Sequence, residues 1–297
     1  MIYTKQAITL ADQINILKQR GLILDDEDET LDVLGHISYF RLAGYWRPLE
    51  QDKQRHIFKP NSHFSTVVSL YRFDTELRML IFSAIQQIEI AVRTKMIQHV
   101  ALKHGPFWFM DTVLASNSGI HAFCLNNLKQ ELSRSSDEFI KEHFRKYSSP
   151  SFPPVWKTLE VASIGTLSKL YNNLNDFKVR KRIAHDFNLP EHQCMGSWLR
   201  SLTVVRNACA HHARLWNAHI SITPQTSVKM RGTWINDLQF PQDKLYPQLC
   251  CIAYWLNSID ANNHFTSDVK ALLAKYPMAD VRAMGFTANW KAEPLWK

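Results

Sequence analysis

The feature that most constrains the fold of this chain is a long stretch of apolar residues at helical spacing. From Leu70 to Met96 the apolar residues recur at steps of three and four, which is the spacing of one face of an α-helix. Glycine and proline, the residues that most often end a helix, are missing from this stretch and first follow it at Gly105 and Pro106. The pattern therefore predicts one long amphipathic helix.

Shorter helical patterns occupy most of the remaining chain, so we expect an all-α fold built as a helical bundle. Prolines, glycines and helix-starting residues such as Asp176 separate these patterns. Besides the long helix, the expected helices cover residues 7–20, 26–37, 120–133, 137–147, 155–174, 176–187, 191–213, 245–259 and 266–275.

Two segments depart from the helical pattern. Residues 39–46 are aromatic and basic, are broken by a glycine and end shortly before a proline, which predicts an irregular packed connection. Residues 220–240 lose the helical period and alternate between apolar and polar side chains at 220–222 and 228–230. This alternation predicts a loop with one small hairpin.

We expect a single domain in three parts. Residues 1–64 form a helical extension, residues 65–219 form the core of the bundle, and residues 220–297 form a loop and the C-terminal helices. Large apolar side chains crowd the segment 284–296, and they predict that this tail docks on the body of the protein.

Composition excludes several classes of protein. The apolar runs are too short and too charged to cross a bilayer, and the N-terminus lacks the apolar block of a signal peptide, so we expect a cytoplasmic protein. Five cysteines without Cys-x-x-Cys spacing argue against a disulfide framework and a zinc ribbon, and predict reduced, mostly buried thiols. A net charge of +8 favours a polyanionic partner only modestly.

Residues 206–211, Arg-Asn-Ala-Cys-Ala-His, carry the strongest chemical signal of the chain. On an ideal helix each residue turns about 100°, so Asn207 and His211 share a face, and Arg206 approaches them from the side. A guanidinium can hold phosphate oxygens, an imidazole can transfer protons near neutral pH, and an amide can orient either group. The three together predict chemistry on a phosphodiester.

With RNA as the substrate, the ribose 2′-hydroxyl is already present as the nucleophile, so neither a metal nor another cofactor is needed. We assign proton transfer to His211, stabilisation of the phosphate charge to Arg206, and orientation of substrate or imidazole to Asn207. One helix supplies few catalytic groups. A second copy facing the first across a two-fold axis would double them, so we expect a homodimer.

The whole sequence resembles the Abi-like family of bacterial abortive-infection proteins, the AbiD and AbiF group, whose core belongs to the HEPN class of helical ribonucleases. The resemblance rests on several separated segments in the same order. They are Ile37-Ser38-Tyr39-Phe40-Arg41-Leu42-Ala43-Gly44-Tyr45, Leu70-Tyr71-Arg72-Phe73-Asp74 with Leu77-Arg78, Ile88-Glu89 with Arg93-Thr94, Arg206-Asn207 to His211-His212 with Arg214-Leu215-Trp216-Asn217, and Met284-Gly285-Phe286 with Trp290 and Leu295-Trp296.

This resemblance implies an all-helical fold, dimerisation and metal-independent RNA cleavage. The family's Arg-x4-6-His motif corresponds to Arg206 and His211 of this chain, with Asn207 in the usual polar second position. The resemblance also implies a role in phage defence or as a toxin. In some relatives a small noncoding RNA restrains the activity, so such an RNA is an expected partner.

Two other groups compete for the catalytic role. His212 is adjacent to His211, but on an ideal helix it points about 140° away from Asn207, so it is the second choice. Arg93 and His99 also fit an Arg-x5-His pattern and would give a second half-site in the same chain. Against this stands Glu89, four residues before Arg93 on the long helix, which is placed to pair with it.

Two residue sets suggest binding rather than catalysis. The basic residues Lys178, Arg180, Lys181 and Arg182 would contact an RNA backbone or form a solvated helix face, with equal weight for both. A metal site would draw on His185, His192, Cys194, His211, His212 and His219. The spacing of these six residues matches no standard zinc pattern, so we expect no metal site.

Three functions follow in order of preference. The first is a homodimeric endoribonuclease with the Arg206 motif in its site. The second is a non-catalytic module that binds RNA or a protein through the same residues. The third is an interaction protein that assembles through its long helix and aromatic tail.

Overall fold

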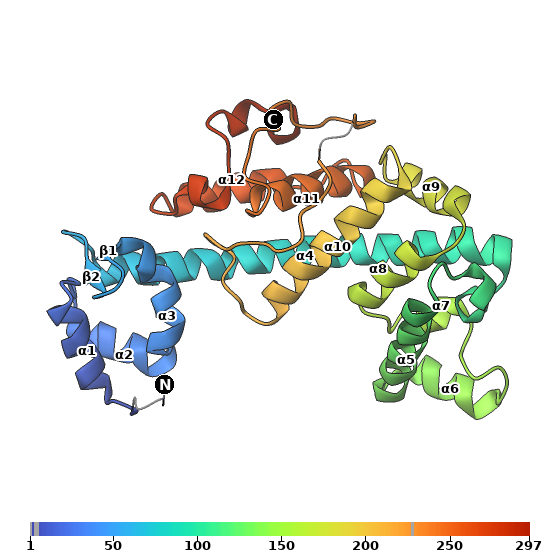
Figure 1. Ribbon diagram of the computed structural model, residues 1–297, viewed down its shortest axis with the longest axis horizontal. Coiled ribbons are helices and arrows are strands. Elements are labelled where there is room, and N and C mark those ends of the chain that lie inside the picture. Colours follow the sequence, from blue (N-terminus) through green and yellow to red (C-terminus); the bar gives the residue numbers. More distant parts are fainter. Residues whose placement is uncertain (1, 3–5, 227–228) are drawn as a thin grey trace. The chain divides into compact units, whose positions relative to one another are not determined.

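The computed structural model describes residues 2, 6–226 and 229–297, and helices dominate it (Figure 1). The expected all-α class is confirmed. The α-helices are α1 (Leu10–Gln19), α2 (Glu27–His36), α3 (Tyr39–Trp46), α4 (Phe64–His104), α5 (Ser118–Arg134), α6 (Glu138–Lys146), α7 (Val155–Thr158), α8 (Ile164–Asn173), α9 (Phe177–Asp186), α10 (His192–Ala210), α11 (Tyr246–Ile259) and α12 (Phe265–Lys275). Strands β1 (Glu50–Asp52) and β2 (Ile57–Phe58) pair antiparallel, and the 3-10 turns are η1 (Arg47–Leu49), η2 (Trp108–Met110), η3 (Thr112–Leu114), η4 (Val281–Met284), η5 (Trp290–Ala292) and η6 (Pro294–Trp296).

Helix α4 is the long helix that the apolar spacing predicts, and it extends further at both ends. Its fully buried side chains, among them Phe73, Ile81, Ile88 and Val92, are each 0% exposed and lie at helical steps along one face. Burial of this stripe, rather than helix propensity alone, holds so long a helix in place.

Contacts divide the chain into two compact units. The first unit consists of Met1–Arg78 and Lys270–Asp280, and the second unit consists of Met79–Val269 and Val281–Lys297. The core of the first unit contains a buried polar cluster on Asp74, which accepts a hydrogen bond from the hydroxyl of Tyr45 at 2.7 Å and another from Arg78. The predicted division of the chain at residues 64 and 219 stays a prediction.

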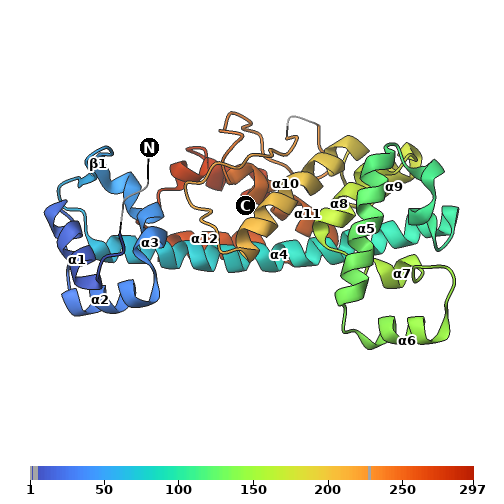
Figure 2. The ribbon, with the colours of Figure 1, turned by 60° about the horizontal axis from the view of Figure 1, so that its bottom comes forward.

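In the second unit, α10 is the central helix, because it packs against α8, α9 and α11 (Figure 2). Trp198 of α10 is 0% exposed, and its ring stacks on that of Trp234 with centroids 5.5 Å apart. Its indole N–H donates to the carbonyl of Gln225 at 2.8 Å. This packing anchors α10, whose C-terminal end carries the predicted site.

The aromatic tail docks on the second unit, as its composition predicts. Trp296 is 0% exposed and its ring stacks on that of Tyr246 in α11, with centroids 6.1 Å apart. Trp290 is buried beside Trp296 at 5.3 Å. The tail therefore belongs to the core of the unit that contains α10.

The irregular connection expected at residues 39–46 is wrong, because this segment forms helix α3. Ser38 caps the helix with its hydroxyl, which accepts from the N–H of Arg41. The buried side chains of Leu42, Tyr45 and Trp46 then hold the helix against the first unit. A good cap and this burial outweigh the entropic cost of the internal glycine, about 1 kcal/mol.

Two further expectations need correction. The helix expected over 155–174 is two helices, because Ser163 caps the start of α8 with its side chain. The small hairpin expected in 220–240 is not found there. The hairpin of the structure is formed by β1 and β2, near the N-terminus. The described residues of 220–240 contain no strand, and Val228, on which that expectation partly rested, lies outside them.

All five cysteines are buried and none lies in a disulfide, so the expected burial of the thiols is confirmed. Within the described ranges, no helix is both long and apolar enough to cross a membrane.

Candidate functional site

Helix α10 ends in a backbone motif that shapes the predicted site. The N–H of Ala213 donates to the carbonyl of Ala208 at 2.8 Å, and the N–H of His212 donates to the carbonyl of Cys209 at 3.1 Å. This pair of bonds is a Schellman ending. His212 has a φ of 55°, so it occupies the left-handed position that glycine takes in most such endings. These two hydrogen bonds hold the turn that follows α10.

The helix expected over 191–213 therefore ends three residues early, at Ala210. Asn207 and His211 nevertheless keep the backbone hydrogen bond of a helix. His211 has φ −95° and ψ 13°, and its N–H still donates to the carbonyl of Asn207 at 2.9 Å. Both side chains are exposed. A substrate larger than a small molecule can reach them without entering a deep cleft.

Arg206 lies to the side of this pair, where α10 crosses α4. Its guanidinium sits over the ring of Phe82 at 5.6 Å from the centroid, a cation–π contact, and its Nη1 makes a long hydrogen bond of 3.4 Å to Oδ1 of Asn207. The arginine is partly buried. Arg206 thereby touches Asn207 through its side chain, whereas Asn207 and His211 are linked through the backbone.

A pocket of about 470 Å³ opens beside Arg206. It is lined by Phe82, Ser83, Gln86, Gln87, Glu89, Ile90, Arg93 and Arg206. All but the last of these come from α4, so the neighbours of Arg206 belong to a helix that is distant in the sequence. The spacing of the hexapeptide gives no sign of them.

Glu89 is the acidic group of this pocket. Burial raises the pKa of its carboxyl, and the positive charges of Arg93 and Arg206 oppose that rise in part. Glu131 of α5 acts in the same direction as burial. Arg206 and Glu89 line the same pocket and interact electrostatically, so a phosphate bound at Arg206 would have to compete with this carboxyl.

Arg93 and His99, the alternative half-site, bind different partners in the protein. Arg93 is 9% exposed and donates to Glu89 at 3.1 Å and to the carbonyl of Ala162 at 3.1 Å. The expected Glu89–Arg93 pair is thus present. His99 instead lies 2.8 Å from a carboxylate oxygen of Asp186. Arg93 lines the pocket beside Arg206, and His99 is not among its lining residues.

The basic cluster of α9 divides into two kinds of side chain. Arg180 is half-buried over the ring of Tyr171 at 5.2 Å, and Lys181 pairs with Glu191 at 2.7 Å. Lys178 and Arg182 are exposed, and neither makes an ion pair with any described residue. Of these four cations, Lys178 and Arg182 are the two that are both exposed and without an ion-pair partner among the described residues, so they are the most accessible to a polyanion.

Three of the six residues considered for a metal site have separate partners in the protein. His185 contacts the carbonyl of Pro190 at 3.2 Å, His219 pairs with Asp243, and the thiol of Cys194 points to the carbonyl of Gln225. In the part of the chain that the structure describes, no group of three or more His, Cys, Asp or Glu side chains could hold a metal ion.

Comparison with known proteins identifies the family of the chain. The family model described as Abi-like protein matches residues 32–217, which is more than half of the 297 residues and includes Arg206, Asn207 and His211. A search of curated proteins and a search of solved structures each gave no match. The match associates the chain with abortive infection, a form of phage defence. The chain belongs to the Abi-like protein family.

Proposed function

We propose that this protein is a cytoplasmic endoribonuclease of the HEPN class, which acts in abortive infection as a toxin against RNA. The observation that carries the proposal is the grouping of Arg206, Asn207 and His211 at one helix end within the segment that matches the family. An exposed imidazole beside a partly buried guanidinium suits a polymeric anion better than a small substrate.

In this mechanism the ribose 2′-oxygen attacks the neighbouring phosphorus, and the bond from phosphorus to the 5′-oxygen breaks. His211 transfers a proton between the reacting oxygens, and Arg206 balances the charge that builds on the phosphate. Asn207 orients the substrate, since its side-chain oxygen accepts from Arg206 and its backbone carbonyl accepts from the N–H of His211. The products are a 2′,3′-cyclic phosphate and a 5′-hydroxyl, and the chemistry requires no metal.

The proposal includes a second copy of the chain, because one helix end offers a single imidazole from the motif. Support comes from α4, where Met79 and Ile90 are 68% and 59% exposed and Phe82 lies between them on the same stripe. This stripe borders the pocket of Arg206. A homodimer that covers it would bring two motifs together, and Ile90→Glu should then shift the protein to a monomer in size-exclusion chromatography with light scattering.

The proposed RNA contacts outside the motif are the exposed Lys178 and Arg182. The two remaining cations of the cluster, Arg180 and Lys181, contribute less, because each already has a partner in the protein. A small noncoding RNA that restrains the activity would use the same basic surface.

The test is an incubation of the purified protein with 5′-labelled single-stranded RNA in excess chelator. The wild type should cut the RNA and leave 2′,3′-cyclic phosphate ends. His211→Ala and Arg206→Ala should abolish cutting with an unchanged far-ultraviolet circular dichroism spectrum. His212→Ala, run in parallel, should retain most of the activity.

Two exposed residues serve as matched controls, one for each residue type. His219→Ala and Arg55→Ala remove side chains that pair with Asp243 and Asp52 at the surface, and both variants should cut at the wild-type rate. Wild-type activity in His211→Ala and Arg206→Ala would refute the assignment of these residues to the catalytic site. Binding that weakens steeply with salt, without product under any condition, would instead indicate the non-catalytic module.

A further inference from the structure

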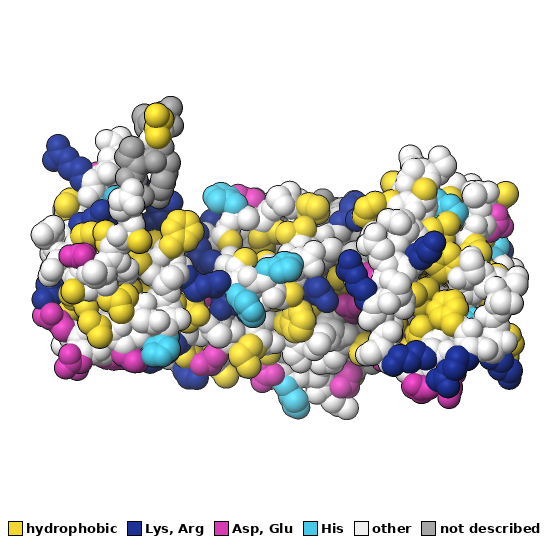
Figure 3. Space-filling model, turned by 90° about the horizontal axis from the view of Figure 1, so that it is seen from below, with side chains coloured by type: hydrophobic (Ala, Val, Ile, Leu, Met, Phe, Trp, Pro, Cys, Tyr) yellow, Lys and Arg dark blue, Asp and Glu magenta, His cyan; other side chains and the backbone are white. Residues whose placement is uncertain are grey.

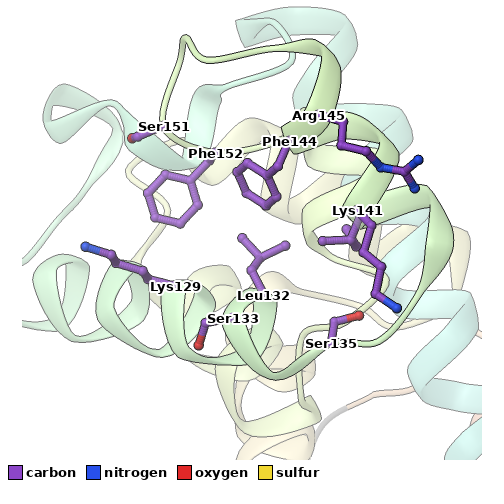
Figure 4. Close-up of a pocket in the computed structure, with 10 residues that line it drawn as sticks. Lys129, Leu132, Ser133, Ser135, Lys141, Phe144, Arg145, Ser151 and Phe152 are labelled. Atoms are coloured by element: carbon purple, nitrogen blue, oxygen red, sulfur yellow. The ribbon is translucent and has the colours of Figure 1, made fainter.

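A second pocket, separate from the Arg206 motif, lies between α5, α6 and the segment that precedes α7. Its volume is about 700 Å³. Figure 4 shows the side chains that surround it. They are Lys129, Leu132, Ser133, Ser135, Ile140, Lys141, Phe144, Arg145, Ser151 and Phe152. The pocket is large enough for a group the size of a nucleoside.

The floor of this pocket is apolar and partly aromatic. Leu132, Ile140 and Phe152 are buried, whereas Phe144 stands at the surface of α6 and is 47% exposed. The two phenylalanine rings and Leu132 gather at the centre of the pocket in Figure 4. An exposed aromatic ring above an apolar floor is a platform on which a planar, apolar group can stack.

The polar groups around this floor are basic or neutral, and none of the lining residues is acidic. Arg145 is paired with Glu138 on α6. Lys129 and Lys141 are exposed and make no ion pair with any residue in the described ranges, so their charges remain for a ligand. Figure 3 shows basic side chains around apolar ones over this part of the second unit.

The cations stand on opposite sides of the floor. In Figure 4, Lys129 lies at one end, and Lys141 with Arg145 lies at the other. A fatty acid or another molecule with a single anionic head would satisfy one end only. A chain with a negative charge on each side of a flat apolar group would satisfy both, and a nucleotide inside a single strand has this layout. In a duplex the faces of the base are covered by its stacked neighbours.

We infer that this pocket binds an internal nucleotide of a single-stranded nucleic acid. The base stacks on Phe144 against the floor of Phe152, and the two flanking phosphates meet Lys129 at one end and Lys141 at the other. That the strand is RNA rests on the proposed function. The pocket is then a holding site for the substrate, distinct from the residues that cut it.

Helix α5 connects this pocket with the candidate site. Lys129 and Leu132 of α5 line the pocket. Helix α5 packs against α8, and α8 packs against α10, the helix that carries the motif. A strand held on one side of α5 is therefore close to the helices that carry the motif.

The test measures binding without cleavage. The probe is a fluorescein-labelled 2′-O-methyl oligouridine, which has no free 2′-hydroxyl, and the readout is fluorescence anisotropy of the full-length protein. Phe144→Ala should weaken binding at least fivefold, which is the lower end of what one base stack contributes. Lys129→Ala and Lys141→Ala should each weaken binding and reduce the slope of log K against log salt by about 0.7.

Matched controls come from the neighbouring surface. Phe123 of α5 is 47% exposed, as Phe144 is, and Lys146 lies on α6 outside the pocket, so Phe123→Ala and Lys146→Ala should change affinity by less than the pocket variants do. If Phe123→Ala weakens binding as much as Phe144→Ala does, the inference is overturned. It is also overturned if a labelled acidic peptide or a fatty acid, but not the oligonucleotide, requires Phe144.

The outcome is separable from that of the proposed function. If RNA is never cut but binding depends on Phe144, the proposed activity fails and the pocket stands. If RNA is cut and Phe144→Ala leaves the KM for RNA unchanged, the activity stands and the pocket inference fails.

Discussion

Removal of the negative charge of Asp176 should destabilise the second unit in a way that depends on pH. This carboxylate caps α9, because its Oδ1 accepts from the N–H of Val179 at 3.1 Å. Its Oδ2 also accepts from Nζ of Lys103 at 2.5 Å and lies 2.8 Å from Nε2 of His104, both near the end of α4. One side chain therefore ties the start of α9 to the end of α4.

The magnitude follows from the pKa of this carboxyl. Burial alone would raise the pKa of Asp176, but the hydrogen bonds from Lys103, His104 and Val179 outweigh burial and lower the pKa from 3.8 to about 2. One pKa unit corresponds to about 1.4 kcal/mol, so the ionised carboxylate contributes about 2 kcal/mol to folding at pH 7. Because the pKa is lowered on folding, this contribution is complete above pH 3.8 and is lost as the pH falls through 2.

Asp176→Asn is the informative substitution, since the amide oxygen can still cap α9 while the charge is lost. In urea unfolding followed by circular dichroism, the variant should be less stable than the wild type by about 2 kcal/mol at pH 7 and by only about 1 kcal/mol at pH 3. The capping residue Asp26 of α2 makes no ion pair with a described residue, so Asp26→Asn is the control and should have a smaller effect. A difference between wild type and Asp176→Asn that is the same at both pH values would refute the reasoning.

Three further predictions concern the candidate site and the core. At the left-handed position of His212, the Gly variant should be about 1 kcal/mol more stable than the Ala variant in urea unfolding, because both lack the imidazole and only glycine adopts this φ without strain; equal stability would contradict the Schellman geometry. Glu89→Gln should tighten binding of labelled RNA about fivefold in anisotropy, because it removes a negative charge that acts on both Arg93 and Arg206; unchanged affinity would contradict a phosphate bound beside these two guanidiniums. In the native protein a thiol reagent should label no cysteine at pH 7, and urea should expose all five, since every thiol is buried and burial raises the pKa of Cys250 to about 12; rapid labelling before urea is added would contradict this packing.

Helical periodicity was enough to predict most of the helices, because burial of one face sets their spacing. It failed where a single capping side chain decides the structure. Ser38 starts a helix in a segment that a glycine interrupts, and Ser163 divides an apolar pattern into two helices. The sequence pattern also did not predict where α10 ends, because His212 occupies the left-handed position in which glycine is usually found.

The candidate site was predictable only where its residues are neighbours in the sequence. The spacing of Asn207 and His211 predicted their shared face, and the backbone bond between them agrees with it. The contacts of Arg206 with Phe82 and Glu89 come from another helix, so no local pattern contains them. The pocket at Phe144 left a weak signal, which is an aromatic residue among the charged residues of an amphipathic helix.

The docking of the aromatic tail has a consequence for when the protein becomes active during synthesis. Trp290 and Trp296 complete the core that surrounds α11, and α11 packs against the helix of the proposed catalytic motif. A nascent chain in which these residues are still inside the ribosome has made α10 but lacks part of the core that supports it. For a protein proposed to destroy RNA, this order of assembly leaves the site without its full support until the tail has emerged and docked.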